Sequence, residues 1–243
     1  MSAFTTVVIP VRNEGRSLVT TIQELSKLYG GGINVIVVVD SEKDLSIAYF
    51  KRINKPKSYN LVINRYGPGP ANAIRYGIDQ ATTQSITVMM ADGSDDFRAI
   101  LELSTLVRRG VAVACASRYM LGGQQIGARR VKRFLSSTAG KSLFILAGIG
   151  THDPTNSFKA YSRDFISKVS IESRSGFELG IELVAKAHRH RLPIAEIPTI
   201  WIEKESGHSS FRIIRWIPKY LRWYFYCFGP KSKVVDNRAG GVT

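Results

Sequence analysis

The chain has 243 residues, and its 34 lysines and arginines outnumber its 19 aspartates and glutamates, giving a formal net charge of +15. Such an excess of positive charge favours a polyanionic partner or a membrane surface. With 44% hydrophobic residues the composition is that of a folded protein, which excludes intrinsic disorder as the main state. Two cysteines are too few for a disulfide scaffold or a thiolate metal site, and they favour a reducing compartment.

No segment of the sequence has the pattern of a secretion signal or a membrane span. The N-terminal residues do not combine a basic region with a long apolar one. The longest apolar stretch, 142–150, is much shorter than the ~20 residues that a spanning helix needs. We therefore expect neither a signal peptide nor a transmembrane helix.

Strands and helices are predicted to alternate along the first half of the chain. Helical spacing of apolar residues predicts helices over 14–29 and 71–80. A helix over 177–190 and a strand over 193–203 are predicted to close the globular part. Short apolar runs rich in β-branched residues predict buried strands, and they span 4–10, 33–40, 59–64, 85–91 and 111–116. The alternation indicates an α/β protein with an open, mostly parallel sheet flanked by helices, whose ligands bind beyond the carboxyl ends of the strands.

Polar residues follow three of these predicted strands, at 10–14, at Asp40 and at the turn 89–96. Asp40, after the second strand, is suited to accept hydrogen bonds from a nucleotide base or ribose, or else to cap a helix. The turn 89–96 concentrates carboxylates and a hydroxyl, which suits a hard divalent cation holding a diphosphate. The alternative for this turn is a solvated acidic loop. The Gly67–Pro70 turn matches no phosphate-binding glycine motif and is interpreted as a shaped loop.

The second half of the chain is strongly basic. Between Arg118 and Asp153 there is no acidic residue. Within this stretch the basic cluster of residues 129–133 is suited to a lipid phosphate at a membrane surface, with a solubilising face or a nucleic-acid patch as alternatives.

The segment 209–229 interleaves aromatic and basic residues. Steps of three and four place its cations on one helix face, and Pro218 is expected to break the segment into two short helices. These cations are Arg212, Arg215, Lys219 and Arg222. Such a segment suits an amphipathic anchor lying in a membrane interface, and the alternative is packing of its rings onto the sheet. Residues 230–243 are predicted to form a disordered tail.

Taken in order, these pieces resemble the family 2 glycosyltransferases, and more narrowly the dolichol-phosphate mannosyltransferase and polyprenyl-phosphate glycosyltransferase group. The resemblance covers residues 4–225, and its strength lies in the ordered series rather than in any one motif. The series comprises VVIPVRNE (7–14), Asp40, the glycine turn with Ala73 and Gly77, ADGSDD (91–96), ASRYMLGG (116–123), DPTNSFKAYSRD (153–164) and the block 177–209.

The resemblance implies a GT-A fold over residues 1–208, followed by a membrane-associating segment, 209–229, and the tail. It also implies a nucleotide-sugar donor, a Mg²⁺ or Mn²⁺ ion, and inverting transfer of one sugar to a polyprenyl or dolichyl phosphate. Such a protein would be cytoplasmic and peripherally attached to the cytoplasmic face of a membrane, with salt-sensitive binding. GDP-mannose and UDP-hexoses both remain open as donors.

Carried over by position, the resemblance assigns the nucleotide to four residues and the metal to the acidic turn. The nucleotide-binding positions are Pro10, Arg12, Glu14 and Asp40, with Asp92 shared between nucleotide and metal. Of the family motif Asp-x-Asp-x-Gln, this chain has Met90, Asp92 and Ser94, so only the middle carboxylate is retained. Asp92 is therefore the first metal ligand expected, with Ser94, Asp95 or a water completing the coordination.

Seven further positions are implied in catalysis or acceptor binding. Arg118 is expected to face the donor diphosphate or the acceptor phosphate. Asp153 is a candidate general base, although an ionised phosphate acceptor is already a nucleophile. The motif Arg-x-x-Gly-x-Ser reads Lys204, Gly207 and Ser209 here, which keeps the charge and loses the bidentate fork of arginine. The acceptor phosphate and the membrane are assigned to Arg129, Arg130, Arg133 and Ser209.

Two rival functions fit parts of the same sequence. Transfer to a saccharide acceptor would leave the basic surface to solubility or a polyanionic glycan. A non-catalytic relative with a degraded metal site would explain Met90. Nucleic-acid binding is not expected, because no recognisable binding module accompanies the positive charge.

Overall fold

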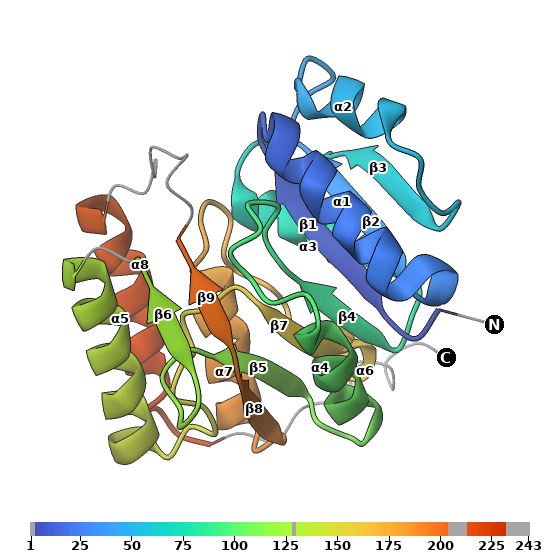
Figure 1. Ribbon diagram of the computed structural model, residues 1–243. Helices are drawn as coiled ribbons and strands as arrows, with labels where there is room; N and C mark the ends of the chain where they lie inside the picture. Colours follow the sequence, from blue (N-terminus) through green and yellow to red (C-terminus); the bar gives the residue numbers. More distant parts are fainter. Residues whose placement is uncertain (1–2, 128–129, 204–212, 232–243) are drawn as a thin grey trace, which may run out of the picture.

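The computed structural model describes residues 3–127, 130–203 and 213–231, and its centre is a seven-stranded open sheet (Figure 1). The strand order is β3-β2-β1-β4-β7-β5-β8. Its strands are β1 (Thr6–Val11), β2 (Asn34–Val39), β3 (Tyr59–Ile63), β4 (Ser85–Val88), β5 (Val113–Ser117), β7 (Lys159–Ser162) and β8 (Ile194–Pro198). Only β7 among them runs antiparallel to its neighbours, β4 and β5. The prediction of an open, mostly parallel sheet is confirmed.

Helices cover both faces of this sheet. The described helices are α1 (Gly15–Tyr29), α2 (Ser46–Arg52), α3 (Pro70–Gln80), α4 (Ala99–Arg108), α5 (Arg130–Ser142), α6 (Arg163–Lys168), α7 (Leu179–Arg189) and α8 (Ile213–Tyr226). A π-helical turn, Leu143–Ala147, continues α5, and a 3₁₀ turn, Gly30–Gly32, follows α1. A second, two-stranded sheet pairs β6 (Gln124–Ile126) with β9 (Ile200–Ile202).

Alternate side chains of the central strands enter two separate cores. Val7 and Ile9 of β1 pack with Leu18 of α1 and Leu103 of α4 on one face. Val8 of β1 packs on the other face with residues of α3, α7 and α8. Because both faces are buried, β1 and β2 are apolar along their whole length instead of alternating with polar residues.

Helix α3 approaches the sheet closely at Gly77. A Cβ atom at this position would lie 2.4 Å from Val8 Cγ1 and 3.0 Å from Val38 Cγ2. Glycine is therefore required here by the packing distance between α3 and the first two strands, although it lowers the intrinsic helix propensity.

The C-terminal region differs from its sequence prediction in one respect. Pro218 lies inside a continuous α8 and does not divide it into two helices. Proline removes one backbone N–H, but the buried Trp223 and Cys227 hold the helix in the core beside α7, which offsets that loss. The rings of α8 are thus divided between the core, which takes Trp223, and the surface, where Phe225 is exposed.

The segment 193–203, predicted as one strand, forms two strands in the structure. Its first part, β8, belongs to the central sheet, and its second part, β9, pairs with β6 in the small sheet. Within the described residues, no helix combines the length and the apolar character needed to cross a membrane. The predicted tail beyond Lys231, like residues 209–212 of the predicted membrane segment, lies outside the described residues.

Candidate active site

The nucleotide-binding positions predicted from the sequence gather at one edge of the sheet. Pro10 lies near the end of β1, and Asp40 directly follows β2. The acidic turn follows β4, and the three strands are neighbours in the order β2-β1-β4. Arg12 is exposed beyond the end of β1, and Glu14 is half-buried where α1 begins. The parallel arrangement of these strands therefore brings their polar carboxyl ends together, where ligands bind in folds of this kind.

Asp40 holds the glycine turn that precedes α3. Its Oδ2 atom accepts a hydrogen bond from the Gly69 N–H at 2.9 Å, and its Oδ1 atom accepts one from Asn64 Nδ2 at 2.8 Å. Gly69 has φ of +120°, a conformation that side chains rarely adopt. An ionised carboxylate can accept about four hydrogen bonds, so Asp40 retains the capacity to bind a base or ribose.

The acidic turn after β4 places two carboxylates close together. Asp92 Oδ1 accepts a hydrogen bond from the Ser94 N–H at 3.0 Å, and the buried Asp95 accepts one from the Met90 N–H at 3.3 Å. Burial, together with the negative charge of Asp92, raises the pKa of Asp95 to about 7. A neighbouring cation would relieve this repulsion.

The donor set of this turn fits a hard divalent ion that is shared with a substrate. In the part of the chain that the structure describes, no three His, Cys, Asp or Glu side chains gather as a metal cluster. Mg²⁺ commonly takes one or two carboxylates and completes its shell with substrate phosphates and water. Asp92 and Asp95 can supply two such ligands, and Ser94, which is buried beside them, offers a hydroxyl.

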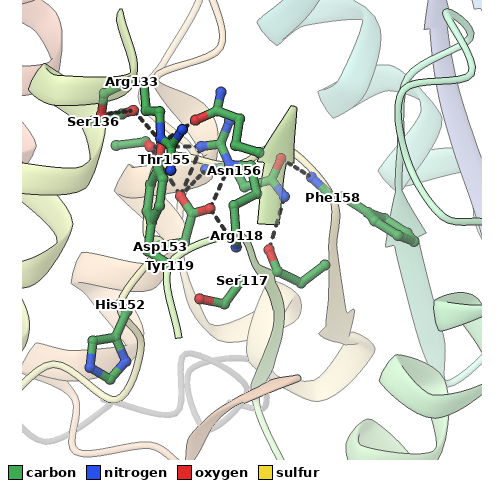
Figure 2. Close-up of polar contacts among 12 residues, drawn as sticks. Ser117, Arg118, Tyr119, Arg133, Ser136, His152, Asp153, Thr155, Asn156 and Phe158 are labelled. Carbon is green, nitrogen blue, oxygen red and sulfur yellow. Dashed lines mark hydrogen bonds and ion pairs between the residues drawn. The ribbon is translucent and has the colours of Figure 1, made fainter. Parts of the chain in front are cut away.

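Arg118 and Asp153 form a buried bidentate ion pair (Figure 2). Arg118 Nε donates to Asp153 Oδ2 at 2.7 Å and Nη2 donates to Oδ1 at 2.9 Å, while the backbone N–H of Arg118 also donates to Oδ2 at 3.1 Å. Burial alone would raise the pKa of Asp153, but the charge and hydrogen bonds of Arg118 hold it below its ordinary value. Asp153 is thus an ionised partner of Arg118, which limits its use as a base.

Lys159 of β7 is a buried cation that the sequence analysis did not single out. It is fully buried, and its Nζ donates to the backbone oxygen of Asn156. Burial lowers the pKa of Lys159, while the charge of Asp153 raises it. Asp95, Arg118 and Asp153 all interact electrostatically with this ammonium. A lysine in the otherwise apolar run FKAY was the signal that could have identified it.

Tyr119 connects this ion pair to α5. The Tyr119 hydroxyl donates to Gln125 Oε1 at 2.9 Å and lies 2.5 Å from Ser136 Oγ on α5, and the Arg118 guanidinium lies over its ring at 5.0 Å (Figure 2). Gln125 is buried, and its Nε2 has no hydrogen-bond partner within the described residues. The exposed Arg133 acts electrostatically on Tyr119 from the same side. An unpaired amide donor beside an arginine is suited to an anionic group.

The segment that precedes Asp153 is anchored by Glu196 of β8. Glu196 Oε2 accepts hydrogen bonds from Thr151 Oγ1 at 3.0 Å and from the His152 N–H at 2.8 Å. The His152 ring lies 2.5 Å from Glu196 Oε1 through Nδ1 and stacks on Phe144 at 3.7 Å between centroids. These contacts fix the backbone from which Asp153 reaches Arg118.

Some predicted positions are not placed by the structure. Arg129, Lys204 and Ser209 lie outside the described residues, and Arg130 begins α5 without a described side chain. Arg215 of α8 likewise has no described side chain. Their roles stay predictions.

The fold and the carboxyl-edge site define the GT-A class of glycosyltransferases. Glucosyl-3-phosphoglycerate synthase from Mycobacterium tuberculosis, solved in complex with UDP, matches 94% of this chain and 81% of its own with a TM-score of 0.65 at 16% identity. A complex of the same protein with Mn²⁺, UDP and glucosyl-3-phosphoglycerate matches with a TM-score of 0.64 at 16% identity, covering 94% of this chain and 81% of that one.

Sequence comparison identifies the family. The model of glycosyl transferase family 2 matches residues 6–170, so the chain belongs to that family and is a glycosyltransferase. The polyprenol monophosphomannose synthase of Mycolicibacterium smegmatis is 26% identical over 213 residues, covering 85% of this chain and 80% of that protein. The human dolichyl-phosphate beta-glucosyltransferase is 29% identical over 223 residues, covering 83% of this chain and 68% of that protein.

Proposed function

We propose that this glycosyltransferase moves a hexosyl group from a nucleoside-diphosphate sugar, GDP-mannose or a UDP-hexose, to a polyprenyl or dolichyl phosphate, with inversion at the anomeric carbon. It works while attached peripherally to the cytoplasmic face of a membrane. The observation that carries this proposal is an exposed apolar face on α5, the π-helical turn and α8, which adjoins the Arg118 site.

We define the apolar face as nine exposed side chains on α5, the π-helical turn, α8 and the turn that follows α8. They are Val131, Phe134, Leu135, Ile145, Leu146, Ile217, Leu221, Phe225 and Phe228. Ile145 is 76% exposed and Phe134 is 67% exposed, although both are large and apolar. α5 and α8 lie side by side, and a 2.9 Å hydrogen bond between Ser142 Oγ and the Tyr224 hydroxyl joins them (Figure 1). Exposed apolar patches of such extent mark interaction surfaces.

The charges around the apolar face favour a bilayer as its occupant. Arg133 and Lys141 are exposed on the same helix, α5, and the chain as a whole carries a net charge of +15. Amphipathic helices with an apolar face and basic flanks bury their apolar side chains at the boundary between headgroups and acyl chains, and anionic lipids strengthen the binding. A lipid-linked substrate would be presented at the depth where this face inserts.

Two groups that suit a phosphate lie between the apolar face and Arg118. They are the exposed Arg133 and the unpaired Nε2 of Gln125, whose Oε1 accepts the Tyr119 hydroxyl. We assign the acceptor phosphate to these groups, with Arg129, Arg130 and Ser209 as further contacts predicted from the sequence. Fixed cations and donors of this kind hold an anion in line for reaction.

The reaction needs no strong base at this site. An ionised oxygen of the acceptor phosphate attacks the anomeric carbon, and the bond from that carbon to the donor diphosphate breaks, releasing the nucleoside diphosphate. Because the nucleophile is already charged, Asp153 is free to remain ionised beside Arg118. Asp153 therefore positions Arg118, and Arg118 with Lys204 stabilises the charge that develops on the leaving diphosphate.

Asp92, Asp95 and Ser94 are the residues that would hold Mg²⁺ or Mn²⁺. A bound divalent ion would neutralise the donor diphosphate and thereby improve it as a leaving group. Two neighbouring carboxylates support this assignment, because a divalent ion would compensate the repulsion that, after burial, raises the pKa of Asp95. Pro10, Arg12, Glu14 and Asp40 would then bind the nucleoside part of the same donor.

The names of the relatives support the acceptor class, whereas the structural neighbour suggests an alternative. The mycobacterial and human relatives are named for polyprenol and dolichyl-phosphate sugar transfer. One neighbour of known structure was solved in complex with phosphoglyceric acid, a small phosphorylated compound. The apolar face favours the lipid, because a soluble acceptor would give no reason for these exposed side chains.

A transfer assay tests the proposal directly. Radiolabelled GDP-mannose and UDP-glucose are offered with polyprenyl phosphate in anionic vesicles, with Mg²⁺, Mn²⁺ or EDTA, to the wild type and to Asp92→Ala. We expect label in the lipid phase that requires a metal ion and is lost in Asp92→Ala. Parallel reactions contain phosphoglyceric acid or an oligosaccharide in place of the lipid. Label in those acceptors alone would overturn the lipid assignment.

A further inference from the structure

Glu178, directly before α7, is a buried carboxylate that the reaction described above does not use. It is 3% exposed, and its Oε1 atom accepts a hydrogen bond from the Gly176 N–H at 3.2 Å. Its Oε2 atom has no hydrogen-bond partner within the described residues. One half of this carboxylate is therefore satisfied by the protein and the other half is not.

The unpaired Oε2 atom of Glu178 is energetically unfavourable. The partial positive charge at the N-terminus of α7 stabilises the carboxylate as a whole. A buried acceptor that makes no hydrogen bond nevertheless costs free energy, because it has lost water without gaining a partner. Native proteins keep few such atoms, and a missing ligand is one of the reasons for keeping them.

Glu178 packs against the indole ring of Trp216. A Cβ atom on Gly176 would lie 2.0 Å from Trp216 Cζ3 and 2.4 Å from Glu178 Oε2. Only glycine therefore permits the ring of Trp216, from α8, to lie beside the carboxylate. Oε2 lies in a dry setting beside the ring, where a hydrogen bond is stronger than one made in water.

Glu178 lies between the two halves of the active site. On one side, Tyr220 of α8 is close enough to both Glu178 and Arg118 for its phenol to interact with their charges. On the other side, the backbone oxygen of Ser175 lies 3.0 Å from the position of a Cβ on Gly69. Gly69 is the residue whose N–H binds Asp40 at the nucleotide edge. The segment carrying Glu178 thus bridges the nucleotide side and the Arg118 side.

We propose that Glu178 Oε2 accepts a hydrogen bond from a hydroxyl of the hexosyl group that is transferred. This inference rests on the proposed function for its donor and adds the residue that recognises the sugar. An unpaired carboxylate repels the diphosphate and the acceptor phosphate, and a lipid chain offers it no donor. The sugar ring, placed between the nucleotide and Arg118, is the neutral part of the substrates that carries hydroxyl groups there.

Binding measurements with and without the sugar test this assignment. Titration calorimetry compares UDP with UDP-glucose, and GDP with GDP-mannose, for the wild type, Glu178→Ala and Glu178→Gln. Glu102→Gln, an exposed carboxylate on α4, is the matched control. We expect Glu178→Ala to weaken the preferred nucleotide sugar by about 10- to 100-fold, the range for a hydrogen bond to a charged group, and to leave the free nucleotide unchanged. Glu178→Gln, which can still accept a hydrogen bond, should lose less.

Deoxy donors locate the hydroxyl that is recognised. A donor lacking that hydroxyl should bind the wild type about 10- to 100-fold more weakly, and the same deletion should cost nothing further in Glu178→Ala. Equal weakening of nucleotide and nucleotide sugar in both Glu178 variants, or no change in either, would overturn the inference. Thermal midpoints show that the variants are folded, and Glu178→Gln keeps the test decisive if Glu178→Ala does not fold.

The two proposals fail in different ways. If the coupling between Glu178 and a sugar hydroxyl is found but no label reaches polyprenyl phosphate, the acceptor assignment is wrong and the role of Glu178 stands. If label reaches the lipid but no hydroxyl couples to Glu178, the proposed function stands and this inference is overturned.

Discussion

The hydroxyl of Tyr119 lies 2.5 Å from the hydroxyl of Ser136, and this contact joins the strand end that carries Arg118 to the helix that carries the apolar face. The strand β5 ends one residue before Arg118, so the position of the ion pair and the position of α5 are set together. A membrane bound at α5 would therefore lie at a fixed distance from the charges that face the reaction.

Replacing apolar side chains at the π-helical turn should weaken membrane attachment without affecting the fold. Ile145 and Leu146 are exposed, so Ile145→Ser with Leu146→Ser removes membrane contacts while leaving the core intact. We expect the double variant to cosediment with anionic vesicles at least tenfold less than the wild type, because each buried apolar side chain adds about 1.5 to 3 kcal/mol. The matched control is Leu101→Ser, a half-exposed leucine on α4, away from this face. Equal binding by all three proteins would contradict a role of this face.

Attachment should also depend on ionic strength. Arg133 is exposed at the start of the apolar face, so Arg133→Gln removes one favourable interaction with anionic headgroups, worth about 1 kcal/mol. We expect a roughly fivefold loss of binding to anionic vesicles at low salt, a smaller loss at high salt, and no loss with neutral vesicles. A loss of the same size under all three conditions would indicate that Arg133 acts through packing and not through charge.

Removing one partner of the buried ion pair should destabilise the protein more than removing both. Asp153→Asn leaves the Arg118 charge buried and uncompensated, which costs about 3 to 5 kcal/mol of unfolding free energy at pH 7. Arg118→Leu combined with Asp153→Leu should cost less than either single change, since no isolated charge remains. Urea unfolding of Asp153→Asn, Arg118→Leu and the double variant measures this order, and a double variant less stable than Asp153→Asn would contradict it.

The pH dependence of the same pair follows from the lowered pKa of Asp153. The pKa of Asp153 in the folded protein lies below its ordinary value of 3.8, so the unfolded chain binds the proton more tightly. The ion pair's contribution to the free energy of unfolding is therefore fully present at pH values above 3.8. It is lost as the pH falls through the lower, folded-state pKa. The difference in stability between wild type and Asp153→Asn should thus be constant from pH 5 to 8 and shrink under acid conditions. A difference that shrinks between pH 5 and 8 would show that another group is responsible.

Local sequence patterns were sufficient for the parts of the fold that depend on continuous burial. The strands β1 and β2 and the helices α1 and α3 were predicted to within about two residues, because their apolar runs and helical spacing are long. The antiparallel β7 could not be predicted in this way. It is four residues long, contains the charged Lys159, and takes its place between β4 and β5 only through tertiary pairing.

In the candidate site, too, some residues could be identified from local sequence and others only from tertiary contacts. Asp40 and Asp92 were identified from their positions at strand ends, which is a local property. The pairing of Arg118 with Asp153 joins residues 35 positions apart, and the unpaired oxygen of Glu178 is defined by packing against α8. No local pattern encodes such contacts, because they are set by which segments the fold brings together.

The close contact between α3 and β1 gives a test of the fold itself. Gly77→Ala would place a methyl group 2.4 Å from Val8 Cγ1 and should destabilise the protein by about 1 to 3 kcal/mol, the usual cost of overpacking a core. Gly31→Ala is the control, because a Cβ at that exposed turn meets no atom within 4 Å. Thermal unfolding should therefore show a lowered midpoint for Gly77→Ala and little change for Gly31→Ala. Equal midpoints for both variants would mean that α3 can move away from the sheet at no cost.

Restoring the carboxylate that the family motif has at position 90 should tighten metal binding. Met90 is half-buried at the start of the acidic turn, and its N–H contacts Asp95. Met90→Asp would add a third negative charge beside Asp92 and Asp95, and the affinity for a hard cation rises with the number of charged oxygen ligands. We expect Met90→Asp to bind Mn²⁺ at least tenfold more tightly than the wild type in calorimetry with UDP or GDP present. Met90→Asn is the control, since it has a similar shape without the charge. If Met90→Asp and Met90→Asn bind Mn²⁺ equally well, the ion is not held at this turn.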